Sequence, residues 1–187
     1  MTDYGEWVEI VTGEVRRTLE RVPAGELARL REAIRGAKRV FVAGKGRSGL
    51  FMRGFAMRLM HQGFTVSVVD EVTTPAIQAG DLLILASGSG KTPSVVQYAT
   101  KAKGCGAQVA LFTAFPDSPT AQQADLVIHV PAPSVKGDGV SGVVSAQPMA
   151  NLFEQSLTLL LDITTLLMMA EIGVDGEQMF SRHANLE

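Results

Sequence analysis

The feature that most constrains the fold of this chain is an alternation of short β-rich runs with helix-like segments. A run such as Leu82–Ala86 is continuously apolar, which is typical of a strand buried on both faces of a sheet. Parallel strands need a crossover connection, and the helices between them supply it. The predicted elements are strands at 39–43, 65–69, 82–86, 108–112 and 126–130, helices at 48–61 and 94–103, and a short helical turn at 73–78. The pattern predicts a doubly wound α/β fold, with a five-stranded parallel sheet between layers of helices.

Helical segments are also predicted on either side of this alternating region. Charged and apolar residues recur at helical spacing over 2–20 and 23–34, and Gly36 is placed to end the second segment. The stretch Leu157–Ala170 is strongly apolar, but it is shorter than a membrane span and Asp162 interrupts it. We interpret it as a buried helix that packs either in the core or against another subunit, and the sequence leaves both alternatives open.

Size and composition limit the classes of function. With 187 residues, 46% of them hydrophobic and 19% charged, the chain fits a single globular domain. The net charge of −2 leaves no broad basic surface, so neither nucleic acid nor an anionic membrane is expected as a partner. The first residues lack the basic segment followed by an apolar segment that is typical of a secretory signal peptide. A cytoplasmic protein is therefore expected. One cysteine, Cys105, and three dispersed histidines predict neither a disulfide nor a metal site.

The motif SGSGKT, after the third predicted strand, ends like a nucleotide-binding P-loop but does not match one. A P-loop needs a glycine five residues before Gly90, and that position is Leu85, inside the predicted strand. What remains is a short Ser/Gly turn before a helix that begins near Pro93. Its hydroxyl groups and the N–H groups of the helix N-terminus are suited to one phosphate.

A second glycine-rich turn, GKGRSG at 44–49, follows the first predicted strand and matches the G-x-G-x-x-G pattern of dinucleotide-binding folds. Asp70 lies at about the separation expected for a ribose-binding carboxylate. Against this alternative, the turn carries Lys45, Arg47 and Ser48, where dinucleotide turns usually have small apolar residues. Because ligands of such sheets bind beyond the carboxyl ends of the strands, the two turns flank one crevice. A sugar phosphate fits this pair better than a dinucleotide does.

The two turns resemble those of the SIS (sugar isomerase) domain family. Within that family the resemblance is strongest to the 6-phospho-3-hexuloisomerases, and it covers nearly the whole chain. The segments that carry it are MRLMHQG, DEVTTPAI, DLLILASGSGKT, Asn151-Leu152-Phe153-Glu154 and the terminal Arg182-His183-Ala184-Asn185-Leu186-Glu187. Lys91 departs from the pattern, which has an acidic residue there. Its side chain either adds positive charge near the phosphate or points to solvent, and we favour solvent.

The resemblance implies an isomerase that interconverts D-arabino-hex-3-ulose 6-phosphate and fructose 6-phosphate, after formaldehyde fixation in the ribulose monophosphate pathway. Such a carbonyl shift needs a base that removes a proton beside the carbonyl and returns it to the neighbouring carbon. It needs no redox cofactor, and a metal is optional where hydrogen-bond donors stabilise the oxyanion. The resemblance also implies a single SIS domain over 1–187, whose segments 2–35 and 148–187 pack on it and on neighbouring subunits. The expected assembly is a homotetramer, or at least a dimer.

Glu154 and His183 are the candidate catalytic residues. If Pro148 opens the last long helix, Glu154 lies about two turns in, and placement in the crevice would desolvate its carboxylate and raise its pKa. The resemblance favours this role for Glu154 over the alternative, a solvated glutamate on the outer face. His183 is the candidate acid–base group for opening the furanose ring or for moving a hydroxyl proton, because histidine is the side chain suited to proton transfer near neutral pH. In the related family it lies on a tail that reaches a neighbouring subunit. The alternative interpretation is that His183 is an ordinary surface residue on a frayed segment near the chain end.

Phosphate binding is assigned to hydroxyl groups and backbone N–H groups of both turns. The hydroxyls are those of Ser48, Ser87, Ser89 and Thr92, and the backbone groups are those of Gly46, Gly88 and Gly90. Arg47 is expected either to clamp the phosphate or substrate hydroxyls, or to pair with Glu71 at the crevice rim. His61 is interpreted as a structural cation at a helix C-terminus. The Gly/Ser/Pro loop 131–147 has the length of a mobile or active-site element.

Two other classes of function are less favoured. One is a sugar-phosphate sensor that binds without turnover, like the SIS domains attached to DNA-binding regulators. However, no helix-turn-helix segment or basic face accompanies this domain. The other is a nicotinamide-dependent dehydrogenase, for which the chain leaves little room for a substrate domain. The sequence therefore favours the isomerase.

Overall fold

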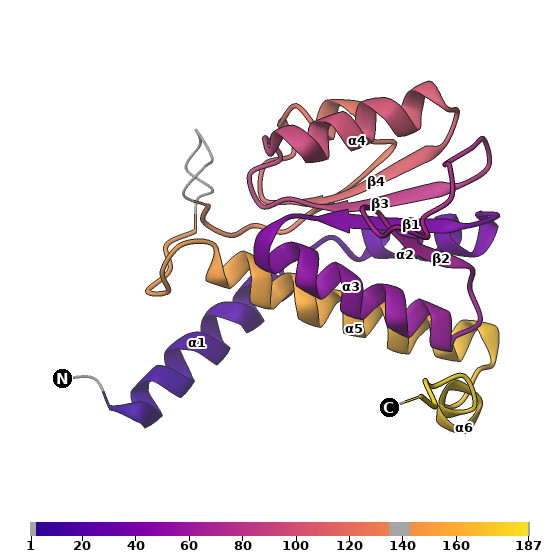
Figure 1. The fold of residues 1–187 in the computed structure, drawn as a ribbon. Helices are drawn as coiled ribbons and strands as arrows, with labels where there is room; N and C mark the ends of the chain where they lie inside the picture. The colour runs from indigo at the N-terminus through magenta and orange to yellow at the C-terminus, as the bar shows by residue number, and fades with distance from the viewer. Residues whose placement is uncertain (1–2, 135–142, 187) are drawn as a thin grey trace.

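Five parallel strands lie side by side at the centre of the molecule (Figure 1). The computed structural model describes residues 3–134 and 143–186. The strands are β1 (Val40–Gly44), β2 (Val66–Val68), β3 (Leu82–Ala86), β4 (Gln108–Thr113) and β5 (Leu126–His129). Their order is β2-β1-β3-β4-β5, so the direction of winding reverses between β1 and β3. Ligands of doubly wound sheets bind at such a switch point.

Helices cover both faces of this sheet (Figure 1). They are α1 (Tyr4–Leu19), α2 (Ala24–Gly36), α3 (Gly46–His61), α4 (Pro93–Gly104), α5 (Asn151–Ile172) and α6 (Gly176–Phe180), with a short 3-10 helix, η1 (Ala121–Gln123). On one face, α2, α3 and α5 enclose the larger core, with Leu30, Phe55 and Leu157 among its members. On the other face, α4 covers a smaller core that includes Val95 and Leu111. The predicted α/β fold with helices on both faces is confirmed.

Two local predictions are wrong. Residues 73–78 hold no helical turn, because Pro75 has no N–H and disfavours a helical conformation at the residue before it. The last long helix begins at Asn151 rather than near Pro148, because Met149 has a left-handed φ of 59°. Glu154 consequently lies in the first turn of α5 rather than two turns in.

Other predictions fall partly on residues that the structure does not describe. The described part of the predicted 131–147 loop consists of 131–134 and 143–147, and its centre, 135–142, lies outside the described residues. Thr2, at the start of the first predicted helix, and Glu187, the last residue of the tail, also lie outside them.

Helix α5 is both a core helix and a surface helix. Its inner face carries buried residues such as Leu157, Leu160 and Met168, whereas Ile163 and Leu166 are exposed. Among the described residues it is the one helix that is long and apolar enough to cross a membrane, but half of its apolar window is buried inside the protein. The inner face therefore matches the predicted core helix. The exposed outer face leaves open the alternative that α5 also packs against another subunit.

An ion pair fixes the ends of β1 and β3 opposite the carboxyl edge of the sheet. Asp81 is 2% exposed, and Arg39 donates to its two carboxylate oxygens over 2.6 and 3.1 Å. The backbone N–H of Gln78 donates to the same carboxylate over 2.8 Å. Burial acts to raise the pKa of Asp81, but the hydrogen bonds from Arg39 and Gln78 outweigh burial and lower it.

We predict that Asp81→Asn lowers the free energy of unfolding by about 2 kcal/mol at pH 7, because a bidentate, charge-assisted pair is lost. Since the folded-state pKa of Asp81 lies below the unfolded value of about 3.9, its contribution is complete above that value and is lost as the pH falls through the folded-state pKa. Urea unfolding at pH 7 and pH 3 measures this. The difference from wild type should shrink at pH 3, and exposed Asp117→Asn should have little effect; an equal difference at both pH values would contradict the prediction.

Candidate active site

The turn after β1 depends on a contact that only glycine permits. A Cβ atom at Gly49 would lie 2.6 Å from the backbone oxygen of Gly44, and Gly46 has a left-handed φ of 57°. The chain therefore passes from β1 into α3 within two residues. This places Ser48 in the first turn of α3, where it is buried.

The turn after β3 is a network of hydroxyl groups. The Ser87 hydroxyl lies 3.2 Å from that of Thr92 and accepts from the Gly90 N–H over 3.1 Å. The Ser89 hydroxyl accepts from the Lys91 N–H over 3.2 Å. Ser87 and Ser89 are buried, and Thr92 precedes α4 without capping it through its side chain. The N-terminus of α4 is thus presented at this turn with no side-chain cap.

The two turns and the start of α5 come together at one edge of the sheet. Gly44 pairs with Ala86 in the β1–β3 register, so the turns begin side by side. A Cβ atom at Gly88 would lie 3.2 Å from the ring of Phe153, so the first turn of α5 packs directly on the second Ser/Gly turn. Glu154, the next residue along α5, consequently belongs to the same region.

Arg47 joins α3 to the start of α5. Its Nη1 atom donates to Asn151 Oδ1 over 2.7 Å and to Glu154 Oε2 over 3.1 Å. The guanidinium lies over the Phe51 ring, 5.5 Å from its centre, in a cation–π contact. The Glu154 side chain is 16% exposed, against 43% for Arg47. The carboxylate is therefore directed at Arg47 rather than at bulk water.

The predicted site residues of the two turns and Glu154 thus lie at one place, with one correction. Arg47 does not pair with Glu71, which instead pairs with Arg53. Sequence reasoning missed Asn151 as a partner of Arg47, although it stands one turn before Glu154 on the same helix face. That spacing is the signal that could have found it.

The geometry around Asp70 weighs against the dinucleotide alternative. The Tyr98 hydroxyl donates to this carboxylate over 2.7 and 2.8 Å, and Lys45 forms an ion pair with it. The hydrogen bond from Lys45, followed by that from Tyr98, lowers the pKa of Asp70. Lys45 also lies 5.2 Å from the centre of the Tyr98 ring. A ribose could reach this carboxylate only by displacing the partners that already occupy it.

His183 lies at the other end of α3 from Glu154. Its ring stacks on His61 at 5.3 Å and on Phe180 at 5.9 Å between centroids. Because α3 runs from Gly46 to His61, these two ends are separated by about 24 Å of helix. Within one protomer, the two candidate catalytic residues are not brought together.

The interpretation of His61 as a capping cation is wrong. His61 is 3% exposed, and burial, followed by the nearby His183 and Arg58, lowers its pKa and favours the neutral ring. The carbonyl at this helix end is satisfied by Arg182 instead, whose Nη1 atom donates to the His61 backbone oxygen over 3.0 Å. The Arg182 guanidinium also lies against Gly63, where a Cβ atom would be 3.5 Å from Arg182 Cζ.

Comparison with known proteins agrees with this arrangement. The family model of the SIS domain matches residues 33–161, which include both Ser/Gly turns and Glu154. The chain belongs to the SIS domain family.

Relatives within this family span almost the whole chain. The 3-hexulose-6-phosphate isomerase of Bacillus subtilis is 42% identical over 97% of this chain and 98% of its own length. The protein of the same name from Mycobacterium gastri is 46% identical over 96% of this chain and 89% of its own length. A Methanococcus jannaschii crystal structure, from which a 3-hexulose-6-phosphate isomerase function was inferred, has a TM-score of 0.85 and 34% identity, covering 97% of this chain and 99% of that one.

The segment that leads into α5 of this SIS domain is held by a residue that sequence reasoning missed. Glu14 of α1 is 8% exposed and accepts from the Ser145 hydroxyl (2.6 Å), the Ala146 N–H (2.7 Å) and the Gln147 side-chain amide (3.1 Å). Burial acts to raise the pKa of Glu14, but these hydrogen bonds and Arg17 outweigh it and lower the pKa. Because α5 begins without a side-chain cap, this clamp helps to fix where it starts.

We predict that Glu14→Ala increases amide hydrogen exchange in residues 143–150 by about 10- to 100-fold, because hydrogen bonds to a charged acceptor are lost. Hydrogen-exchange mass spectrometry measures this, with β3 and β4 as internal references. The matched control is Glu20→Ala, at the residue that follows the same helix, which removes only an exposed ion pair with Arg16. Unchanged exchange in 143–150 would show that Glu14 does not hold this segment.

Proposed function

We propose that this protein is a 6-phospho-3-hexuloisomerase, which interconverts D-arabino-hex-3-ulose 6-phosphate and fructose 6-phosphate through an enediolate. The observation that best supports the proposal is the contact of Arg47 with Glu154 beside the two Ser/Gly turns. The relatives that match nearly the whole chain carry the name 3-hexulose-6-phosphate isomerase. We further infer a cytoplasmic enzyme of formaldehyde fixation through the ribulose monophosphate pathway.

In this proposal the phosphate binds between the two turns. The hydroxyls of Ser48, Ser87, Ser89 and Thr92 are the donors, together with the backbone of Gly46, Gly88 and Gly90. The uncapped N-terminus of α4 adds the positive end of a helix dipole. A phosphate held there leaves the sugar carbons extending toward the first turn of α5.

Glu154 is the proposed base. It removes the proton from the carbon beside the carbonyl and returns it to the adjacent carbon, so one carboxylate serves both transfers. Arg47 holds the carboxylate in position and supplies a fixed positive charge near the developing enediolate oxygen. The reaction leaves the overall oxidation state of the sugar unchanged, so it requires no redox cofactor.

His183 completes the site from a second protomer in this proposal. Its separation from Glu154 by the length of α3 supports a shared site rather than one built within a protomer. We therefore propose a homotetramer of single SIS domains over residues 1–187, in which segments 2–35 and 148–187 pack on the domain and on neighbouring subunits. His183 would transfer a proton during opening of the sugar ring, or would move the hydroxyl proton from the oxygen that becomes the carbonyl to the former carbonyl oxygen.

We predict that Glu154→Gln lowers kcat by about 10²- to 10⁴-fold with little change in KM, because the base is lost while the phosphate contacts stay. A coupled assay that supplies the 3-hexulose 6-phosphate and follows fructose 6-phosphate measures this. The matched control is Asp162→Asn, an exposed carboxylate further along the same helix, which should keep wild-type activity. Substrate binding without turnover by the wild type would indicate a sensor and overturn the proposal.

A mixing experiment tests the shared site. Glu154→Gln and His183→Asn should each be weakly active alone, whereas mixed oligomers should regain activity at about a quarter of their sites, those that combine an intact Glu154 with an intact His183. The mixture is made by unfolding and refolding the two variants together, with each variant refolded alone as control. Failure of the mixture to exceed the two variants alone would place both residues in one protomer's site or remove His183 from the reaction.

A further inference from the structure

The second Ser/Gly turn is held from behind by the segment that joins β4 to η1. The Gly90 carbonyl oxygen accepts from the Thr120 hydroxyl over 2.7 Å and from the Thr120 N–H over 3.1 Å. The Gly88 carbonyl oxygen accepts from the Ala114 N–H over 3.1 Å and from the Thr113 hydroxyl over 3.3 Å. Thr113 and Thr120 are both fully buried. Two carbonyl groups of the turn are therefore directed into the protein interior.

Gly90 fits against this segment only because it has no side chain. A Cβ atom at Gly90 would lie 1.9 Å from the Ser118 hydroxyl oxygen, and Gly90 has a left-handed φ of 61°. Ser118 is 2% exposed, and among the described residues its hydroxyl has no hydrogen-bond partner. The turn is thus packed closely on the segment, while the hydrogen bonds from Thr120 fix the direction in which the Gly90 carbonyl points.

The orientation of this peptide sets the direction of the next N–H group. In a trans peptide the C=O group and the N–H group that follows it point in opposite directions. Because the Gly90 carbonyl points at Thr120, the Lys91 N–H points away from Thr120. It donates to the Ser89 hydroxyl oxygen over 3.2 Å. A hydroxyl oxygen that accepts this bond keeps its own hydrogen for donation, and a phosphate oxygen is a strong acceptor. Thr120 therefore acts on Ser89, a proposed phosphate donor, through a single peptide group.

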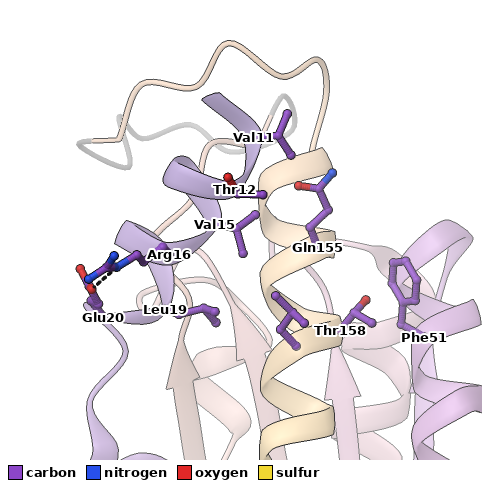
Figure 2. Close-up of a pocket in the computed structure, with 10 residues that line it drawn as sticks. Val11, Thr12, Val15, Arg16, Leu19, Glu20, Phe51, Gln155 and Thr158 are labelled. Carbon is purple, nitrogen blue, oxygen red and sulfur yellow. Dashed lines mark hydrogen bonds and ion pairs between the residues drawn. The ribbon is translucent and has the colours of Figure 1, made fainter. Parts of the chain in front are cut away.

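The apolar groove between α1 and α5 does not compete with this turn for a phosphate. Figure 2 shows this groove, of about 560 Å³, with Phe51 of α3 beside it. Arg16 in the groove is already paired with Glu20. The hydroxyls of Thr12 and Thr158 donate to carbonyl oxygens of their own helices. The groove thus offers little to neutralise a charged group, whereas the hydroxyls of the second Ser/Gly turn are held in position to donate.

We infer that Thr120 is a positioning residue for phosphate binding. It does not touch the substrate, but it fixes the Gly90 peptide and through it the direction in which Ser89 donates. The segment that carries Thr120 follows β4, which pairs with β3 up to the start of the turn, so the sheet holds both ends of this contact. The inference rests on the proposed function in one respect, because it takes the substrate phosphate to bind at this turn.

Thr120→Val tests the inference, because it removes the hydroxyl and nearly keeps the shape of the side chain. We expect the dissociation constants of fructose 6-phosphate and of inorganic phosphate, measured by isothermal titration calorimetry, to rise about 3- to 10-fold. KM should rise by a similar factor while kcat changes less than about twofold, since the phosphate contact is the same in the ground state and the transition state. Thr120→Ser keeps the hydroxyl and should bind like wild type. Thr120→Ala is a second variant that lacks the hydroxyl.

Two further variants separate positioning from stability and from packing. Thr164→Val in α5 removes another fully buried hydroxyl, which donates to the Leu160 carbonyl over the same 2.7 Å. It should lower the free energy of unfolding in urea about as much as Thr120→Val does, yet bind both probes like wild type. Ser118→Ala removes the hydroxyl that lies against Gly90 but leaves the Thr120 hydrogen bonds in place, so it should also bind like wild type.

The inference is overturned if Thr120→Val and Thr120→Ala bind both probes as tightly as wild type, if Thr164→Val or Ser118→Ala weakens binding equally, or if Thr120→Ser fails to keep it. A wild-type protein that binds both probes with this dependence on Thr120 but forms no fructose 6-phosphate would overturn the isomerase proposal alone. A wild-type protein that binds neither probe would overturn both proposals.

Discussion

The register between β1 and β3 is the constraint on which the candidate site depends. Gly44 pairs with Ala86, so both strands end at one level and the two Ser/Gly turns begin as neighbours. A slip of one residue would turn every side chain of β3 to the opposite face, and β3 is buried along its whole length. The bidentate Arg39–Asp81 pair secures the opposite ends of these strands. The distance between the turns is therefore a property of the sheet rather than of mobile loops.

Helix α5 fixes the position of the Glu154 carboxylate relative to this sheet. Its buried face belongs to the main core, and its first turn rests on the second Ser/Gly turn through Phe153 and Gly88. Gly88 is needed here because a side chain would crowd that ring. Partial burial of Glu154 carries a desolvation cost, which the Arg47 contact offsets. The same packing that stabilises the fold thus determines the position of Glu154.

The sequence predicted what depends on local pattern and missed what depends on contacts distant along the chain. Continuous apolar strands and the Gly/Ser turns that follow them identified the sheet, and hence the edge at which the turns meet. The resemblance to a family, rather than any periodicity, singled out Glu154 and His183. Two other contacts were missed, that of Arg47 with Asn151 and that of Glu14 with Ser145, because their partners are 104 and 131 residues apart. The start of α5 was misplaced because Met149 adopts a left-handed φ. Nothing in the sequence indicates that conformation at a residue other than glycine.

The C-terminal segment has a structural role within the protomer that bears on its proposed role between protomers. Arg182 satisfies the end of α3, and His183 stacks on the buried His61, so the segment is anchored at that end of the helix. A residue that must serve a neighbour's site gains from such anchoring, because less conformational freedom is lost when the neighbour binds. The same argument applies to α1 in the segment 2–35, which is proposed to pack on neighbouring subunits, because its exposed first half is already helical and is capped by Asp3. Both segments are ordered by their own chain while their outward surfaces remain open, which is the arrangement that favours association between preformed copies.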